Sequence, residues 1–383
     1  MASTQNMCVR CVMDTTDPDI QFDETGVCNH CRYYDDLAQT VLLSEDEKAA
    51  KLQEVVAEIK AAGQGKSYDC ILGISGGVDS TYLAHILKKL GLRPLAVHLD
   101  NGWNSELAVS NVEKVLKFLE IDLYTRVLDW EEFRDLQLSF LKASVPDAEI
   151  PTDHAIMSTL YQVTAEQGLR HIISGANVVT EAVLPTSWTY GIGDWRYISG
   201  IHRQFGKEKL KSYPHFTRDQ WYYYTFIKKI NYVCLLDYLP YYKKEAMRVL
   251  EEELGWQYYG GKHYESIYTR FFQGYILPTK FNIDKRKAHL SNLICSDQMT
   301  REEALAELAH NAYLEDQSQA DLEYVTKKLE LTAHEFQMIM SLPRKSYKDY
   351  KTYQNVTSLD RLRVKALGVA KAGYQAKKKL SGA

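Results

Sequence analysis

The chain has 383 residues, of which 45% are hydrophobic and 25% are charged, and its net charge is −4. These proportions are typical of a globular protein with a sizeable core, and they exclude a global basic field that would attract nucleic acid or anionic lipid. The first residues lack the basic and apolar segments of a signal peptide, and no run of about 18 apolar residues occurs. We therefore expect a cytoplasmic protein without membrane insertion.

Four cysteines near the start of the chain form two C-x2-C pairs, Cys8 with Cys11 and Cys28 with Cys31. In a reducing compartment this spacing favours a metal site over disulfides. Four thiolates fill a tetrahedral coordination shell and leave no position for a substrate, so we expect a structural zinc ion, with an iron–sulfur cluster as the alternative. The sequence therefore predicts a small zinc knuckle over residues 1–40.

The next part of the chain, over residues 41–210, alternates between helical and strand patterns. A capping box of Ser44 and Glu47 precedes a predicted helix over 44–62. Apolar spacing predicts strands over 68–74, 94–99, 123–128 and 171–174, and helices over 81–90, 105–120, 130–142 and 153–167. This alternation is typical of an α/β fold, a parallel sheet with helices on both faces.

Strand patterns end near residue 210, and we predict a mostly helical C-terminal region over 211–383. A capping box of Thr300 and Glu303 marks the start of one of its helices. The segment after Asp360 carries seven Lys or Arg residues and no acid. It is expected to be a solvated end, with a contact to phosphate or to a partner as the alternative.

A glycine-containing hexapeptide lies between a predicted strand and a predicted helix. It consists of Ser75, Gly76, Gly77, Val78, Asp79 and Ser80. The glycines let the backbone approach a ligand closely, and the unpaired N–H groups at the start of the helix favour an anion. The serines add hydroxyl donors, and Asp79 can cap the helix or bind a metal ion. The spacing excludes a Walker A motif and the dinucleotide-binding fingerprint, and a glycine turn without a ligand is the alternative.

The hexapeptide resembles the S-G-G-x-D-S signature of the PP-loop ATP pyrophosphatases, which include the asparagine, GMP and NAD synthetases and several tRNA-modifying enzymes. Members of this superfamily cleave ATP between the α and β phosphates, transfer AMP to a substrate oxygen and hold pyrophosphate in this loop. The resemblance implies an adenine nucleotide alpha hydrolase-like fold with ATP bound at the six loop residues.

Polar residues follow two other predicted strands. Asp100 ends the second strand, and Gly175, Asn177 and Glu181 follow the fourth. Because ligands bind at the carboxyl ends of strands in open α/β sheets, we expect Asp100 and Gly175 to contact ATP. Glu181 resembles the magnesium-binding glutamate of related synthetases, which implies a magnesium site made by Asp79 and Glu181, and an exposed loop charge is the alternative.

Longer segments resemble the N-acetyl sugar amidotransferase family of WbpG and PseA type. These segments cover residues 8–20, 22–31, 75–80, 174–177 and 280–291. The resemblance implies that ATP adenylates the amide oxygen of an N-acetyl group on a nucleotide-linked sugar. Ammonia would then replace this oxygen to give an acetamidino sugar for surface polysaccharide (O-antigen) or glycan biosynthesis.

The source of the ammonia is a separate question. The sequence contains no convincing glutaminase, since Cys8 is needed for the predicted metal site. The family resemblance therefore implies two partners, a separate glutaminase subunit and a barrel subunit that delivers ammonia.

Cations gather in the segment 270–291, and a solvated helix face is the plain explanation for them. We expect Lys280 and Arg286 to act in catalysis through phosphate contacts, because ammonium and guanidinium groups bind phosphate well. The glycine-flanked, aromatic segment 191–200 is expected to form a mobile lid or a platform for the sugar, with a surface loop as the alternative. The residues expected at the sugar nucleotide are Asn177, Trp195, Arg196 and Lys287.

Two other functions remain open. A tRNA thiolation enzyme shares the PP-loop, but such enzymes usually need further cysteines, and Cys70, Cys234 and Cys295 are isolated in this sequence. The third possibility is a zinc-bearing scaffold that binds nucleotide without turnover. An intact S-G-G-x-D-S loop with candidate metal carboxylates argues against this scaffold.

Overall fold

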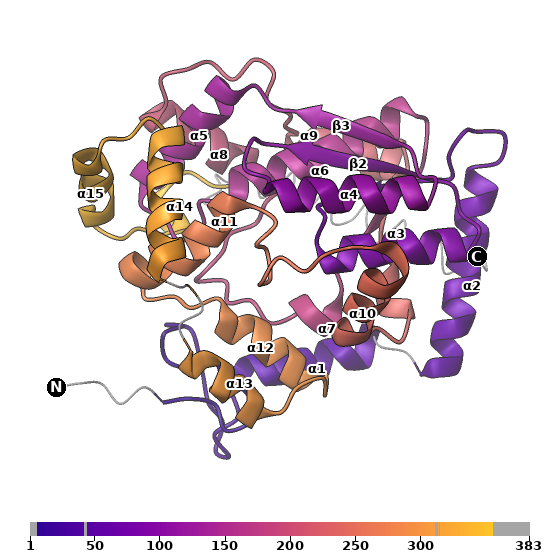
Figure 1. Ribbon diagram of the computed structural model, residues 1–383, viewed down its shortest axis with the longest axis horizontal. Helices are drawn as coiled ribbons and strands as arrows, with labels where there is room; N and C mark the ends of the chain where they lie inside the picture. The colour runs from indigo at the N-terminus through magenta and orange to yellow at the C-terminus, as the bar shows by residue number, and fades with distance from the viewer. Residues whose placement is uncertain (1–5, 42–43, 311–312, 314, 355–383) are drawn as a thin grey trace.

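The computed structural model describes residues 6–41, 44–310, 313 and 315–354 (Figure 1). At its centre is a five-stranded parallel sheet in the order β3-β2-β1-β4-β5. The strands are β1 Cys70–Gly73, β2 Pro94–Asp100, β3 Leu123–Val127, β4 His171–Ser174 and β5 Asn231–Cys234. The basic segment after Asp360 lies outside the described residues.

Helices cover both faces of the sheet, which confirms the expected α/β fold. On one face α2 (Glu45–Ala62), α3 (Val78–Lys89), α4 (Glu106–Phe118) and α10 (Lys243–Leu254) share an apolar core with alternate residues of β1, such as Leu72. On the other face α6 (Ile150–Glu166) packs Leu160 and Val163 against Ile71. Because successive strand residues point to opposite faces, the continuous apolar run of β1 serves both cores.

The strand β5 is the one that the sequence analysis missed. It pairs with β4 from His171↔Asn231 to Ser174↔Cys234, so it completes the sheet from within the region predicted to be helical. Its short, half-exposed sequence carries little strand pattern. The other α-helices are α1 Asn29–Val41, α5 Trp130–Ala143, α7 Val178–Glu181, α8 Trp195–Phe205, α9 Arg218–Tyr222, α11 Ile267–Phe271, α12 Arg286–Cys295, α13 Arg301–Ala309, α14 Glu315–Lys328 and α15 Ala333–Ser341.

Local signals placed several helix starts correctly. The capping boxes at Ser44 and at Thr300 are both present. By contrast, α3 begins at Val78 rather than at the predicted residue 81, because Gly77 is its N-cap. The second half of the glycine-containing hexapeptide therefore forms the first turn of this helix.

The cysteine knuckle packs against helices of the C-terminal region, which are distant from it in sequence. Helix α1 begins inside the knuckle and lies beside α12, which in turn packs against α13 (Figure 1). The N–H of Val12 donates to the Oγ of Ser291 over 3.3 Å, and Arg301 donates to the carbonyl oxygens of Cys8 and Cys11, both over 3.1 Å. The knuckle is thus an integral part of the C-terminal helical region.

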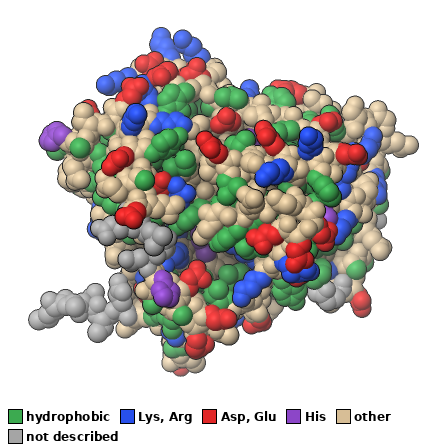
Figure 2. Space-filling model, viewed as in Figure 1, with side chains coloured by type: hydrophobic (Ala, Val, Ile, Leu, Met, Phe, Trp, Pro, Cys, Tyr) green, Lys and Arg blue, Asp and Glu red, His purple; other side chains and the backbone are tan. Residues whose placement is uncertain are grey.

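The surface carries charges of both signs. Figure 2 shows acidic and basic side chains interspersed over the visible face. Within the described ranges, no helix combines the length and the apolarity needed to cross a bilayer.

Candidate active site

The predicted phosphate loop connects β1 to α3 at the carboxyl end of the sheet. Gly76 has φ +86°, which L side chains rarely adopt, and a Cβ atom on it would lie 3.0 Å from the carbonyl oxygen of Ala108. Gly175, after β4, approaches the loop so closely that a Cβ atom there would lie 2.8 Å from the backbone nitrogen of Ser80. The loop therefore requires glycine at both positions to keep this shape.

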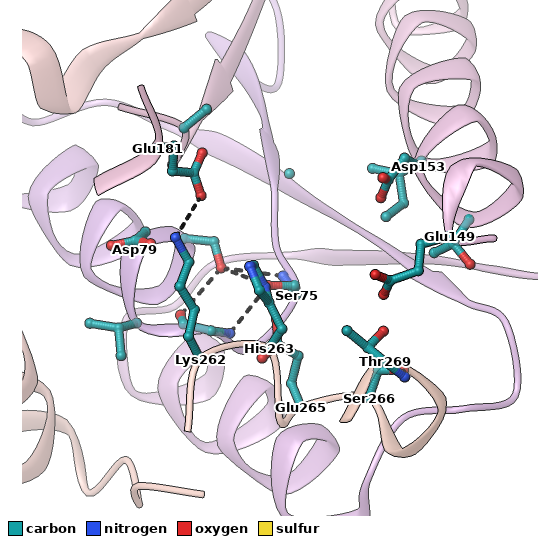
Figure 3. A pocket seen from close by; sticks show the side chains of 18 of the residues that line it. Ser75, Asp79, Glu149, Asp153, Glu181, Lys262, His263, Glu265, Ser266 and Thr269 are labelled. Carbon is teal, nitrogen blue, oxygen red and sulfur yellow. Dashed lines mark hydrogen bonds and ion pairs between the residues drawn. The ribbon is translucent and has the colours of Figure 1, made fainter. Parts of the chain in front are cut away.

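The loop opens onto a pocket with a cavity of about 550 Å³. Its floor is formed at the carboxyl ends of β1, β2 and β4, and its other walls come from α6 and from the segment 258–292 (Figure 3). The predicted site residues that line it are Ser75, Gly77, Val78, Asp79, Ser80, Gly175 and Glu181. The structure thus brings the two expected strand-end segments together at one site.

The two serines of the loop present hydroxyl groups at the pocket surface. Their Oγ atoms lie 3.3 Å apart, and the N–H of Gly77 donates to the Oγ of Ser75 over 3.2 Å. The N–H of Ser75 donates to the Oγ of Ser80 over 3.3 Å. Together with the N-terminus of α3, these donors form an environment that favours a bound anion.

The two residues expected to hold magnesium both line the pocket: Asp79 within the loop and Glu181 near it (Figure 3). The hydroxyl of Tyr241 donates a hydrogen bond to Asp79, and the Nζ of Lys262 lies 3.4 Å from Glu181 Oε1. Burial raises the pKa of Asp79 above its ordinary value, Glu181 adds to this rise, and Lys262 opposes it. One or two carboxylates with phosphate oxygens are usual magnesium ligands, so this pair fits such an ion.

Basic side chains that the sequence analysis did not assign also line the pocket: Lys243, Lys262, His263, Lys285 and His289. Burial and then Lys262 lower the pKa of Lys243. Burial, followed by Lys262 and His263, moves the pKa of His289 well below its ordinary value, so this imidazole is neutral. Lys285 and His289 lie in the cation-rich segment 270–291 that the sequence had marked, whereas no motif surrounds Lys243 or Lys262.

A polar wall lies across the pocket from Asp79, where Figure 3 shows Glu149 and Asp153. Glu149 accepts a hydrogen bond from Gln273 Nε2 over 2.9 Å and pairs with Lys285 Nζ at 3.3 Å. Burial lowers the pKa of Lys285, but Glu149 and the neighbouring aspartates outweigh this effect and raise it. Desolvation in the pocket, together with the charge of Glu149, raises the pKa of Asp153 above its ordinary value. The wall offers both hydrogen-bond donors and acceptors to a polar ligand.

Apolar side chains line the pocket between these two ends. They come from β2, with Val97 and Leu99, and from α6, with Ile156, Met157 and Leu160. An apolar surface flanked by a few polar groups is typical of small-molecule sites and accommodates a purine base.

Asp100 and Asn177, which were predicted to contact ligands at the strand ends, accept hydrogen bonds from neighbouring backbone N–H groups instead. Asp100 accepts a hydrogen bond from the N–H of Gly102 over 2.8 Å, while its neighbour Asn101 lines the pocket. Asn177 caps α7 by accepting from the N–H of Thr180 over 2.9 Å. Neither Asp100 nor Asn177 lines the pocket.

Lys280 and Arg286, expected to contact phosphate, do not line the pocket either. Lys280 is buried, and its ammonium group donates to the carbonyl oxygen of Ile339. Arg286 pairs with Asp284, with an Nη2–Oδ2 distance of 2.7 Å. Both cations therefore have acceptors within the C-terminal region.

The remaining residues expected at the sugar nucleotide also lie outside the pocket lining. Trp195, at the start of α8, stacks on His215 with ring centroids 4.1 Å apart, and Arg196 follows it on the same helix. Lys287 of α12 forms an ion pair with Asp14 of the knuckle at 2.5 Å.

The four cysteines form a second, separate site. The Sγ atoms of Cys8, Cys11, Cys28 and Cys31 all lie within 4.8 Å of one another, and the four residues are fully buried. Neighbouring sulfurs lie 3.7–3.9 Å apart, and four thiolates bound at about 2.3 Å to a tetrahedral ion are about 3.8 Å apart. The N–H of Cys28 also donates to the Sγ of Cys8 over 3.2 Å. The expected cluster of four cysteines is confirmed, and its geometry fits a tetrahedral metal ion such as zinc.

Comparison with protein families identifies the last part of the chain. Residues 265–363 match a family described as LPS biosynthesis protein WbpG-like, C-terminal domain. This part of the chain is WbpG-like. The resemblance to WbpG-type proteins is therefore confirmed here. The WbpG-like region supplies Glu265, Gln273, Lys285 and His289 to the pocket, so it shares one cavity with the glycine-containing loop.

Two curated relatives match shorter stretches. An uncharacterized protein of Methanocaldococcus jannaschii is 32% identical over 135 residues, which are 34% of this chain and 45% of that protein. The tRNA-specific 2-thiouridylase MnmA of Helicobacter hepaticus is 31% identical over 112 residues, which are 27% of this chain and 32% of that protein. The chain thus matches less than half the length of each relative.

Several solved structures match part of the chain. NMN synthetase from Francisella tularensis has 16% identity and a TM-score of 0.28, covering 49% of this chain and 72% of that chain. NH3-dependent NAD synthetase from Campylobacter jejuni has 17% identity and a TM-score of 0.27, covering 36% and 58%. A predicted subunit of tRNA methyltransferase from Methanocaldococcus jannaschii has 17% identity and a TM-score of 0.29, covering 48% and 76%. These scores are low, and the fold assignment rests on the sheet itself.

Proposed function

We propose that the protein is an ATP-dependent N-acetyl sugar amidotransferase. It adenylates the N-acetyl amide oxygen of a nucleotide-linked sugar and replaces it with ammonia, giving an acetamidino sugar for surface polysaccharide (O-antigen) or glycan biosynthesis. One observation carries the proposal: Ser75 and Gly77 of the phosphate loop line the same pocket as Gln273 and Lys285 of the WbpG-like region.

The groups around the loop support cleavage of ATP to AMP and pyrophosphate. The N-terminus of α3, the serine hydroxyls and the ammonium groups of Lys243 and Lys262 surround this end of the pocket. They would stabilise the charge that develops on pyrophosphate as its bond to the α-phosphorus breaks. Asp79 and Glu181 would hold magnesium, which supplies further charge neutralisation when it is bound.

The polar wall of Glu149, Asp153 and Lys285 supports binding of the sugar across from the loop. The amide oxygen attacks the α-phosphorus, and pyrophosphate leaves. Ammonia then adds to the imidate carbon, a proton is lost, and AMP departs with the former amide oxygen. Because AMP is a far better leaving group than an amide oxygen, positioning of the reactants supplies much of the remaining rate enhancement.

Three further expectations belong to this proposal. Ammonia comes from a separate glutaminase subunit through a barrel subunit. The cysteine cluster holds a structural zinc ion, because its four ligands leave no open position. The enzyme acts in the cytoplasm, where its ATP and nucleotide sugar are made.

A second candidate is a tRNA thiolation enzyme, which the likeness to MnmA favours. Sulfur transfer of this kind needs a reactive cysteine, and no cysteine in the described part of the chain lines the pocket. Burial raises the pKa of Cys70 well above its ordinary value and that of Cys234 to about 11. Both thiols are thus poorly suited to form the reactive thiolate.

Product analysis by mass spectrometry tests these functions. The purified protein is incubated with magnesium ATP, an ammonium salt and a panel of nucleotide-linked N-acetyl sugars. A sugar with one oxygen replaced by NH, formed with an equal amount of AMP, supports the amidotransferase. Release of ADP and phosphate contradicts it, and AMP formed only with tRNA supports the second candidate. A wild-type protein that binds nucleotide but forms no AMP with any substrate, and whose Ser75→Ala variant keeps its nucleotide complexes, indicates a scaffold instead.

A further inference from the structure

Trp256 contacts the phosphate loop from outside the S-G-G-x-D-S motif. Its indole Nε1–H donates a hydrogen bond to the carbonyl oxygen of Gly76 over 3.1 Å. The side chain is 1% exposed and follows Gly255, the C-cap of α10, which has φ +65°.

The peptide between Gly76 and Gly77 directs its two polar groups to opposite sides. In a trans peptide the C=O and the N–H point in opposite directions. The carbonyl of Gly76 points to the buried indole, whereas the N–H of Gly77 points to the Oγ of Ser75, which lines the pocket. The N–H of Gly77 therefore lies on the side of the pocket, where it supports the Ser75 hydroxyl, and the carbonyl acceptor stays in the core.

Two consecutive glycines would also permit the opposite orientation, because no Cβ atom restricts the peptide between them. In that orientation the carbonyl of Gly76 would face the pocket and repel phosphate oxygens, and the N–H of Gly77 would be lost as a donor. The flip would leave the indole N–H of Trp256 buried without an acceptor, which is unfavourable.

The position of Trp256 is itself fixed by neighbouring contacts. Asn111 of α4 donates to the carbonyl oxygen of Gln257 over 2.8 Å and accepts from its N–H over 3.0 Å. The indole also packs edge to face on Tyr259, with ring centroids 5.5 Å apart. The backbone beside the indole is therefore held against α4.

We propose that Trp256 is a positioning residue for the phosphate loop, whose indole N–H holds the Gly76–Gly77 peptide in the orientation that binds pyrophosphate. This inference rests on the proposed function, since it takes the loop to be the pyrophosphate site. It adds to that site a residue, Trp256, that lies outside the S-G-G-x-D-S motif.

Trp256→Phe removes the N–H donor and keeps an aromatic ring, and Trp188→Phe is the matched control. Trp188 is also 1% exposed, and its Nε1 has no hydrogen-bond partner among the described residues. We expect Trp256→Phe to raise the Kd of pyrophosphate and of magnesium ATP about tenfold by isothermal titration calorimetry, as loss of one well-placed donor would. The KM for ATP should rise while the KM for ammonium stays unchanged, a split that a general loss of stability does not produce. Trp188→Phe should leave all of these constants at the wild-type values.

Equal affinities of wild type and Trp256→Phe would overturn the inference and leave the proposed function intact. A wild-type protein that binds neither pyrophosphate nor ATP would overturn the proposed function, and the inference with it. If Trp256→Phe does not fold, Asn111→Leu releases the backbone beside the indole. That variant should show the same selective rise in Kd, and an unchanged Kd would overturn the inference.

Discussion

Lys287 of α12 and Asp14 of the cysteine knuckle form a buried ion pair with an Nζ–Oδ2 distance of 2.5 Å. The Asp14 side chain is 1% exposed and that of Lys287 is 14% exposed. The same helix carries His289 into the pocket. Helix α12 therefore connects the cysteine knuckle to the proposed active site.

Replacing Lys287 should destabilise the fold, because Lys287→Met leaves the Asp14 carboxylate buried without its partner. We expect the free energy of unfolding in urea to fall by about 3 kcal/mol. Arg248→Met is the control, since its partner Glu245 is 54% exposed. This exposed pair should contribute less than about 1 kcal/mol. Equal effects of the two substitutions would contradict the role assigned to the buried pair.

The cysteine cluster should contain metal in the freshly purified protein. Elemental analysis is expected to find zinc in equimolar amount, and Cys11→Ala should lose the metal and lower Tm. Cys70→Ala removes an equally buried thiol outside the cluster and should keep the metal. Protein with neither zinc nor iron would contradict the assignment, and iron in place of zinc would favour the iron–sulfur alternative.

Two adjacent lysines at the start of α10 should differ in their effect on ATP. Lys243 lines the pocket, whereas its exposed neighbour Lys244 does not. Lys243→Met should raise the KM for ATP about tenfold, because a partly buried cation beside the triphosphate is removed. Lys244→Met should leave the KM unchanged. Similar values for both variants in an AMP-formation assay would show that Lys243 does not bind the triphosphate.

Asp147 should make the stability depend on pH. Burial raises the pKa of Asp147 to about 6 from the ordinary 3.8, although Lys285 opposes the rise. The folded protein therefore binds this proton more tightly than the unfolded chain does, and the stabilisation present below about pH 4 is lost as the pH rises through 6. Relative to wild type, Asp147→Asn should gain about 3 kcal/mol in unfolding free energy between pH 4 and pH 7. Asp219→Asn, on the surface of α9, is the control, and parallel pH curves for wild type and Asp147→Asn would refute the prediction.

A substitution of Lys280 distinguishes a structural role for this cation from the phosphate contact expected from the sequence. Since its ammonium group donates to the carbonyl oxygen of Ile339, Lys280→Met should lower the unfolding free energy by about 1–2 kcal/mol. AMP formation per folded molecule should stay at the wild-type rate. A large loss of AMP formation without a change in stability would instead support the phosphate contact expected from the sequence.

Features encoded by short-range patterns could be predicted from the sequence. The cysteine pairs, the phosphate loop and four strands each depend on residues close together in the chain. Short-range patterns could not show which of several consecutive cations lines the pocket, because neighbouring residues on a helix point about 100° apart. At the start of α12, Lys285 faces the pocket, Arg286 pairs with Asp284, and Lys287 reaches the knuckle.

Pocket side chains supplied by distant parts of the chain could not be predicted from the sequence either. Lys243 and Lys262 meet the loop only through the packing of the C-terminal region, and no motif surrounds either residue. The strand β5 is recognisable only by its pairing with β4. Periodicity cannot reveal such placements, since it describes each segment by itself.

The contacts between the knuckle and the C-terminal region also set an order of assembly. Val12 bonds to Ser291 across 279 positions of sequence, and Arg301 bonds to Cys8 across 293. During synthesis the knuckle leaves the ribosome long before these partners exist, and contacts of such high sequence separation form slowly. Nascent chains that end before residue 291 therefore expose the apolar surface of Val12 and Met13, which the finished fold buries completely. The knuckle is thus translated long before the helices that complete its native environment.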